Sequence, residues 1–157
     1  MTDSSNTEED TMRDDLVDRL LAQPGLYIGT SHDNRSNVTP QVARIVLRPL
    51  PGRSGVSFDF EGLSQDPARR RAHAEHSLLA RTSTGLTLYT AHIHAPVTVE
   101  LREEAPGEFE AVEGSSPYPL TITIDIPEPG HLTYMWTFSF PGADAPVRQV
   151  AELVRVE

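Results

Sequence analysis

The chain has 157 residues, no cysteine and a formal net charge of −10, and this length is about that of one domain. Without cysteine the chain has no disulfide, thiolate nucleophile, Cys-type zinc site or thiolate-bound iron–sulfur cluster. The acidic charge argues against a nucleic-acid partner, because proteins that bind nucleic acids use a basic surface to contact phosphates. No basic region precedes an apolar run and no eighteen apolar residues occur together, so we expect a cytoplasmic protein with no signal peptide and no membrane span.

The N-terminal segment changes character near residue 14. Residues 1–13 have almost no apolar side chains and are predicted to be a disordered acidic tail. After them, Leu16, Val17, Leu20 and Leu21 fall at helical spacing, and "QPG" at residues 23–25 provides a stop. The sequence therefore predicts a short helix of about two turns at the start of a single domain that covers residues 14–157.

Ten segments after this helix alternate between apolar and polar residues, and each is predicted to be a β-strand. Glycine- and proline-rich turns such as "PLPGRSG", "STG" and "PEPG" separate them. Because most of these connections are short, sequential strands are expected to be antiparallel neighbours. The predicted strands cover residues 25–31, 42–50, 55–62, 72–82, 86–94, 97–104, 108–114, 120–126, 131–140 and 147–156.

The alternation gives most of these strands one apolar face. In residues 120–126 the leucine and isoleucine positions share one face, and the threonine and aspartate positions share the other. One apolar face per strand indicates either a two-sheet sandwich or a barrel that closes on itself. Since closure removes exposed strand edges, we predict an all-β fold, an antiparallel up-and-down β-barrel of about ten strands with a short N-terminal helix.

The two ends of the strand series resemble those of the calycin superfamily, which includes lipocalins, fatty-acid-binding proteins and nitrobindin-like barrels. "GLYIGTS" (25–31) is similar to the opening strand of that superfamily, with Tyr27 in place of its usual tryptophan and Gly29 behind it. "AELVRVE" (151–157) is similar to its last strand, whose arginine packs across that aromatic ring, and Arg155 is the matching residue. The resemblance implies a barrel whose first and last strands are held together by this contact.

The C-terminal segment also resembles that of nitrobindin-like haem proteins, in which a histidine shortly before an Ala-Glu-Leu run ligates the haem iron. When residues 151–153 are placed on that run, Arg148, or Gln149 with a one-residue slip, stands where the histidine belongs. Neither side chain is a haem ligand. We therefore predict no cofactor, and haem in particular is not expected.

The two histidines in "AHIHAP" (91–96) raise the question of a metal site. Alternation along a strand places His92 and His94 on one face. The surrounding stretch resembles the first cupin motif, which implies that His92, His94 and Glu100 hold Fe, Mn, Ni or Zn. However, the spacing is about a residue too long and Pro96 interrupts the strand. The favoured interpretation places both histidines at the rim of the barrel mouth, and a cupin-like metal-dependent enzyme is the alternative.

Other motifs give no support for catalysis. Ser31, His32 and Asp33 are consecutive, but neighbours along a strand point to opposite faces and do not form a catalytic triad. The sequence has no nucleophile elbow, phosphate-binding loop or dinucleotide fingerprint. The basic run at residues 69–71 is expected to be a solvated loop or strand edge. No catalytic residue is predicted.

The leading hypothesis is that the barrel binds a small, largely apolar ligand in its interior, without established catalysis. His76 is expected to point inward with Leu78, and it would add polarity to an apolar cavity. A third possibility, besides the metal-dependent enzyme, is a filled barrel that acts as an interaction module through its acidic surface. The predicted ligand-binding residues are Phe58, Phe60, His76, Leu88, His92, Ile122, Ile124, Tyr134, Trp136 and Phe138.

Overall fold

The computed structural model of the chain describes residues 15–35, 37–68 and 70–157. The predicted acidic tail lies outside the described residues, as does Arg69 of the basic run. The described residues form helix α1 (Leu16–Leu21), a 3₁₀ turn η1 (Pro51–Arg53) and the strands β1 (Gly25–Asp33), β2 (Gln41–Pro49), β3 (Gly55–Leu63), β4 (Arg71–Thr82), β5 (Gly85–His92), β6 (Thr98–Ala105), β7 (Glu108–Ala111), β8 (Leu120–Asp125), β9 (His131–Phe138) and β10 (Val147–Arg155).

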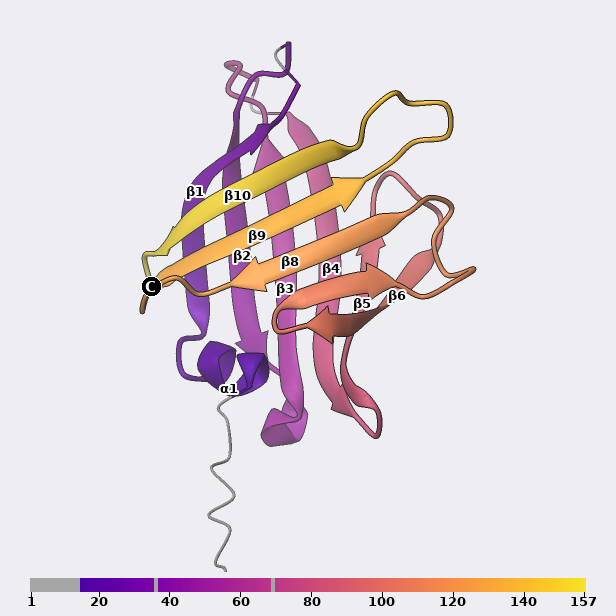
Figure 1. The fold of residues 1–157 in the computed structure, drawn as a ribbon. Coiled ribbons are helices and arrows are strands. Elements are labelled where there is room, and N and C mark those ends of the chain that lie inside the picture. Colours follow the sequence, from indigo (N-terminus) through magenta and orange to yellow (C-terminus); the bar gives the residue numbers. More distant parts are fainter. Residues whose placement is uncertain (1–14, 36, 69) are drawn as a thin grey trace, which may run out of the picture.

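The strands form one closed antiparallel barrel in the order β1-β10-β9-β8-β7-β6-β5-β4-β3-β2 (Figure 1). Every strand pairs with its neighbours in sequence, and the pairing of β1 with β10 closes the sheet. The prediction of an up-and-down barrel of about ten strands with one short helix is confirmed. The predicted strand ends lie within three residues of the observed ones.

The register of the closing strands β1 and β10 bears on the predicted contact between Tyr27 and Arg155. Tyr27 on β1 lies opposite Arg155 on β10. Burial raises the pKa of the Tyr27 phenol, and the positive charge of Arg155 opposes this shift. At Gly29 a Cβ atom would lie 1.8 Å from the carbonyl oxygen of Glu152. Only glycine therefore allows β1 and β10 to approach each other this closely.

Helix α1 lies across one end of the barrel (Figure 1). Asp15 caps its N-terminus by accepting a hydrogen bond from the backbone N–H of Asp18 at 2.9 Å. All four of its apolar residues are buried and join the barrel core, and Arg81 on β4 forms ion pairs with Asp15 and Asp18. No helix among the described residues is long and apolar enough to cross a membrane.

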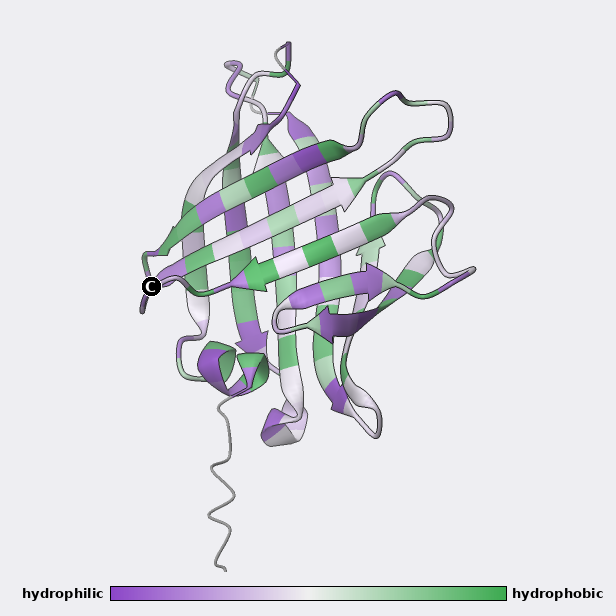
Figure 2. Cartoon of the chain, in the orientation of Figure 1, coloured by the Kyte–Doolittle hydropathy of each residue, from purple (hydrophilic) through white to green (hydrophobic). Residues whose placement is uncertain are grey.

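Side chains fill the part of the barrel next to α1. Alternation along the strands is visible as green and pale bands on β8 (Figure 2), and the apolar positions of this strand are buried. Inside the barrel, Phe58 meets Tyr134 edge to face with their ring centroids 5.7 Å apart. A cavity lies at the opposite end, called the mouth here, where β4 and β10 begin and β5 and β9 end.

Candidate functional site

A cavity of about 280 Å³ opens at the mouth of the barrel. Its walls combine aromatic rings with polar side chains from both halves of the chain. The lining residues are Asp33, Arg35, Val38, Gln41, Ala72, His73, Glu75, His92, His94, Tyr118, Leu120, Trp136, Phe138, Phe140 and Gln149.

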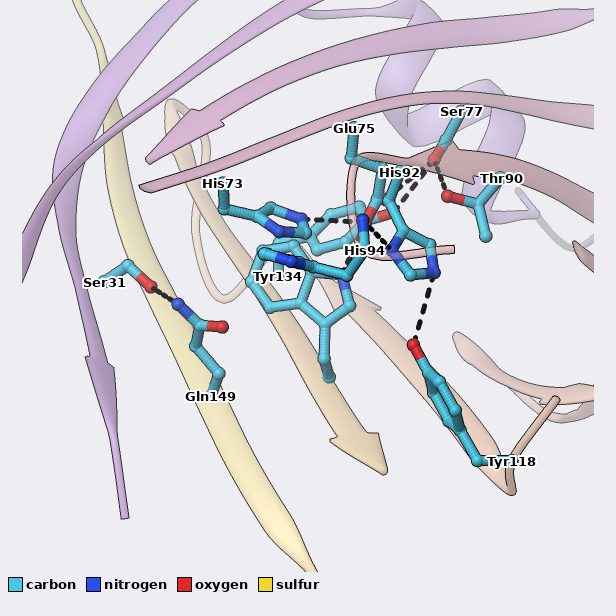
Figure 3. Close-up of polar contacts among 11 residues, drawn as sticks. Ser31, His73, Glu75, Ser77, Thr90, His92, His94, Tyr118, Tyr134 and Gln149 are labelled. Atoms are coloured by element: carbon cyan, nitrogen blue, oxygen red, sulfur yellow. Dashed lines mark hydrogen bonds and ion pairs between the residues drawn. The ribbon is translucent and has the colours of Figure 1, made fainter. Parts of the chain in front are cut away.

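The floor of this cavity contains a buried glutamate. Glu75 points inward from β4, and its side chain is only 2% exposed. One carboxylate oxygen, Oε1, accepts hydrogen bonds from the Tyr134 hydroxyl at 2.7 Å and the Ser77 hydroxyl at 2.8 Å. The other, Oε2, accepts one from the Trp136 indole N–H at 2.7 Å. Two strands that lie about sixty residues apart in the sequence thus meet at one carboxylate (Figure 3).

These contacts keep the carboxylate ionised. Burial acts to raise the pKa of Glu75, but its contacts with His73, Tyr134 and Ser77 outweigh burial and hold this pKa below its usual value. Burial and the charge of Glu75 together raise the pKa of Tyr134 well above its usual value, so this side chain remains a hydrogen-bond donor. The hydrogen bonds around Glu75 are therefore charge-assisted, the stronger class.

His73 stands between the carboxylate and the open end of the cavity. Its Nε2 atom lies 3.5 Å from Glu75 Oε2, beyond the length of a well-formed hydrogen bond, and has no closer partner among the described residues. The ring packs against Phe60 at 5.5 Å and Trp136 at 5.7 Å between centroids. These contacts fix the plane of the imidazole, and its Nε2 edge faces an anion.

Two more histidines extend this group toward the rim. The ring of His94 stacks on that of His73 with centroids 5.1 Å apart, and the ring of His92 lies 6.1 Å from that of His73. The backbone N–H of His94 donates to His92 Nδ1 at 3.3 Å, and the Tyr118 hydroxyl lies 3.4 Å from His92 Nε2 (Figure 3). Burial, ahead of any neighbouring charge, lowers the pKa of both His92 and His94 below the usual 6.5. Both rings are therefore neutral at pH 7.

The structure does not bring together the residues of the cupin-like set. His92 faces inward at the end of β5, whereas Glu100 lies opposite the exposed Tyr89 on the outer surface and pairs with Arg102 at 3.2 Å. Within the described part of the chain, no group of three or more His, Cys, Asp or Glu side chains is placed to hold a metal ion. The rim position predicted for His92 and His94 agrees with the structure.

The predicted inward orientation of His76 is wrong. Its side chain is 57% exposed on the outer surface and contacts Asp59. The inner face of β4 instead carries His73, Glu75 and Ser77. Adjacent leucines at residues 78 and 79 allow either phase of alternation, so the apolar pattern of this strand does not decide which face is buried. Sequence reasoning consequently missed both Glu75 and His73.

The other predicted ligand-binding residues divide between the core and the cavity. Phe60 and Tyr134 pack beneath the cavity, with ring centroids 4.7 Å from that of Trp136. Three residues line the cavity itself, namely His92, Trp136 and Phe138. Four are buried in the packed core and lie outside its lining, namely Phe58, Leu88, Ile122 and Ile124.

Comparison with known proteins places the fold. No protein-family model matches the chain, and no curated protein sequence matches it. The crystal structure of Rv2717c from M. tuberculosis matches with a TM-score of 0.64 and 15% identity, covering 88% of this chain and 98% of that one. The S-type phycobiliprotein lyase CPES from Guillardia theta matches with a TM-score of 0.56 and 11% identity, covering 88% and 90%. The fold is that of the calycin barrels. The calycin resemblance of the terminal strands is thereby confirmed as a likeness of fold.

In this barrel, the position at which the nitrobindin-like resemblance expects a haem ligand is occupied by an amide. Gln149 faces the cavity from β10 and donates a hydrogen bond to the Ser31 hydroxyl at 3.0 Å (Figure 3). Arg148 is exposed and contacts the sulfur of Met135. Haem iron is held by histidine, cysteine, methionine or tyrosine, so the residue at this position does not fit a haem.

Proposed function

We propose that this protein binds a small organic ligand in the mouth cavity of its barrel. The observation that carries the proposal is the buried carboxylate of Glu75 beneath the cavity, which accepts hydrogen bonds from Tyr134, Trp136 and Ser77. Ligand sites typically combine apolar walls with a few fixed polar groups, and this cavity has both. A binding role in the cytoplasm remains the working proposal.

The energetic cost of this arrangement argues against a purely structural role. A buried charge costs several kcal/mol of desolvation, and an apolar core of similar volume is often as stable or more so. Two further polar atoms beside the cavity, His73 Nε2 and Gln41 Oε1, are buried without a hydrogen bond. Groups that reduce stability and gather at the open end of a barrel are those expected at a binding site.

The size of the cavity sets the size of the ligand. At about 280 Å³ it lies just below the range of roughly 300 to 1,000 Å³ that drug-sized molecules occupy. The remainder of the interior is filled, because the core side chains beneath the cavity are almost wholly buried. The ligand therefore sits at the mouth, beside Trp136 and Phe138. The same cavity argues against a completely filled barrel that acts only as an interaction module.

The fold by itself supports a ligand-carrying role only in general terms. One protein with this fold is by name a phycobiliprotein lyase, yet a single fold serves many functions. The proposal therefore depends on the cavity and its polar groups, and it extends no activity from the matched structures to this chain.

A single tryptophan provides the test. Trp136 is the only tryptophan of the chain, it lines the cavity, and its indole N–H is bonded to Glu75. A ¹⁵N-labelled sample therefore gives one indole resonance, which we expect to shift in a saturable way when benzamide is added as a small aromatic probe. Gln149→Phe, which fills the cavity, should abolish this shift, whereas Val150→Phe, on the outer face of the same strand, should not. No saturable shift in the unmodified protein would overturn the proposal.

A further inference from the structure

One wall of the mouth cavity is a column of aromatic side chains along β9. Trp136, Phe138 and Phe140 all line the cavity, and their spacing of two residues places them on one face of the strand and its continuation. The column runs from the floor to the rim, because Trp136 is bonded to Glu75 and 5% exposed, whereas Phe140 is 46% exposed. A ligand in this cavity therefore lies against an aromatic wall.

Tyr118, from the segment between β7 and β8, belongs to the same wall. Its ring centroid lies 6.0 Å from that of Phe138 and 5.5 Å from that of Phe140, and the two phenylalanine rings lie 5.1 Å apart. Their interplanar angles of 47° to 76° are those of tilted and edge-to-face pairs, which aromatic rings prefer. An aromatic ligand extends this array on the cavity side, whereas a saturated ring gains only the burial of its surface.

The contact with His92 determines what the Tyr118 hydroxyl offers to a ligand. Burial lowers the pKa of His92, so this ring is neutral at pH 8 and carries one proton. His92 Nδ1 accepts the backbone N–H of His94 at 3.3 Å, which places the ring proton on Nε2. This N–H faces the Tyr118 hydroxyl oxygen, 3.4 Å away (Figure 3). The hydroxyl oxygen is therefore the acceptor of this contact, and the Tyr118 proton takes no part in it.

The free proton of Tyr118 sets a requirement for any ligand that covers it. Burial, more than the charge of Glu75, raises the pKa of Tyr118 above its usual value, so the hydroxyl keeps its proton at pH 8. Among the described residues this hydroxyl has no hydrogen-bond partner besides His92. Water can accept the proton while the cavity is open, but a ligand that displaces this water leaves a buried donor unsatisfied unless it supplies an acceptor.

We infer that the mouth cavity binds an aromatic compound with a carbonyl group beside its ring, which packs against Phe138 and Phe140 and accepts a hydrogen bond from Tyr118. The inference rests on the proposed binding function and names the class of ligand for the same cavity. A carbonyl oxygen fits because it accepts a hydrogen bond and needs no acceptor in return. Benzamide belongs to this class, and so does acetophenone.

Three probes of similar size separate the two requirements. Acetophenone has both the aromatic ring and the carbonyl group, ethylbenzene has only the ring, and cyclohexyl methyl ketone has only the carbonyl group. Each would be titrated at pH 8 and followed by the Trp136 indole resonance. Acetophenone should bind about fivefold more tightly than cyclohexyl methyl ketone, as the preference of aromatic rings for one another predicts. Equal affinity for these two ketones would overturn the aromatic requirement.

Tyr118→Phe tests the hydrogen bond. This variant should bind acetophenone about fivefold more weakly, as the loss of one neutral hydrogen bond predicts, and it should bind ethylbenzene no more weakly than the unmodified chain does. The matched control Tyr89→Phe, on the outer surface, should leave both affinities unchanged. An equal effect of Tyr118→Phe on both probes would refute the role of the hydroxyl. If ethylbenzene binds too weakly to follow, an acetophenone affinity that is equal in Tyr118→Phe and Tyr89→Phe would refute it.

Phe140→Leu tests the aromatic wall at its most exposed ring. The change should narrow the difference between acetophenone and cyclohexyl methyl ketone to about twofold, because one of the rings that favour an aromatic ligand is removed. An unchanged difference would refute the contribution of Phe140. A chain that binds benzamide but not acetophenone would overturn the inference and leave the binding function intact, whereas failure of both compounds to bind would overturn both.

Discussion

Removing one hydroxyl group tests whether the carboxylate beneath the cavity is charged. Tyr134 is fully buried, and its hydroxyl donates to Glu75 at 2.7 Å. A hydrogen bond to a charged group contributes about 1.5–3 kcal/mol to stability, so Tyr134→Phe should lower the free energy of unfolding by that amount at pH 7. At roughly 2–4 °C per kcal/mol for a chain of this size, the midpoint of thermal unfolding should fall by several degrees.

The matched control is Tyr27→Phe. Tyr27 is equally buried, and its hydroxyl donates at 2.7 Å to the backbone carbonyl of Gln23, which is neutral. This change should cost only about 0.5–1.5 kcal/mol. Both variants would be unfolded in urea and followed by circular dichroism and Trp136 fluorescence. Equal costs for the two substitutions at pH 7 would refute an ionised Glu75.

The pH dependence of the stability cost of Tyr134→Phe provides a second test of whether Glu75 is ionised. The folded pKa of Glu75 is lowered, so its ionisation stabilises the fold fully above the unfolded value of 4.5, and this contribution is lost as the pH falls through the lower folded value. Tyr134→Phe removes one of the contacts that lower this pKa. The cost of Tyr134→Phe should therefore shrink as the pH is lowered from 7 to 3, while that of Tyr27→Phe should change little. A cost of Tyr134→Phe that does not change with pH would contradict the assignment.

Three further outcomes are expected. His76→Ala removes an exposed side chain and should change the free energy of unfolding in urea by no more than about 1 kcal/mol. The variant should still bind benzamide, and loss of this binding would mean that His76 acts at the site. Gly29→Ala should destabilise the barrel by at least about 1–3 kcal/mol in thermal unfolding, because its Cβ would meet the backbone of Glu152, and a neutral effect would contradict the close approach. The lowered pKa values of His92 and His94 mean that the unfolded chain binds more protons below pH 6.5, so stability should fall between pH 7 and 5. In the double variant His92→Gln, His94→Gln, urea titrations should show a smaller decrease in the free energy of unfolding between pH 7 and 5. A decrease equal to that of the unmodified chain would exclude these two histidines as its source.

The barrel was predictable because its strands repeat every two residues and their turns are short. β8 is the clearest case, since its leucine and isoleucine positions occur in one phase only, and all of them are buried. β4 is the opposite case. Apolar residues occupy both phases near Leu78 and Leu79, and the buried phase carries His73 and Glu75. In a sequence, a polar residue on the inner face of a strand cannot be distinguished from one on the outer face. The prediction therefore assigned the wrong face of β4 to the barrel interior.

The candidate site was only partly predictable, because its polar floor depends on contacts between distant strands. His92 and Trp136 were identified from the strand ends and the aromatic pattern, and both line the cavity. Glu75 could not be identified, since two of its three hydrogen-bond donors come from β9, and no local pattern shows which strands will face each other across a barrel. Tyr118 lies in the segment between β7 and β8, where alternation gives no information.

The most direct measurement is native mass spectrometry of the full chain purified from its own source, together with the Gln149→Phe and Val150→Phe variants. If the mouth cavity binds a small organic ligand, the unmodified chain and Val150→Phe should carry the same non-covalent adduct, and Gln149→Phe should carry none. An adduct that persists in Gln149→Phe, or an unmodified chain that carries no adduct and does not respond to benzamide, would contradict binding at the mouth.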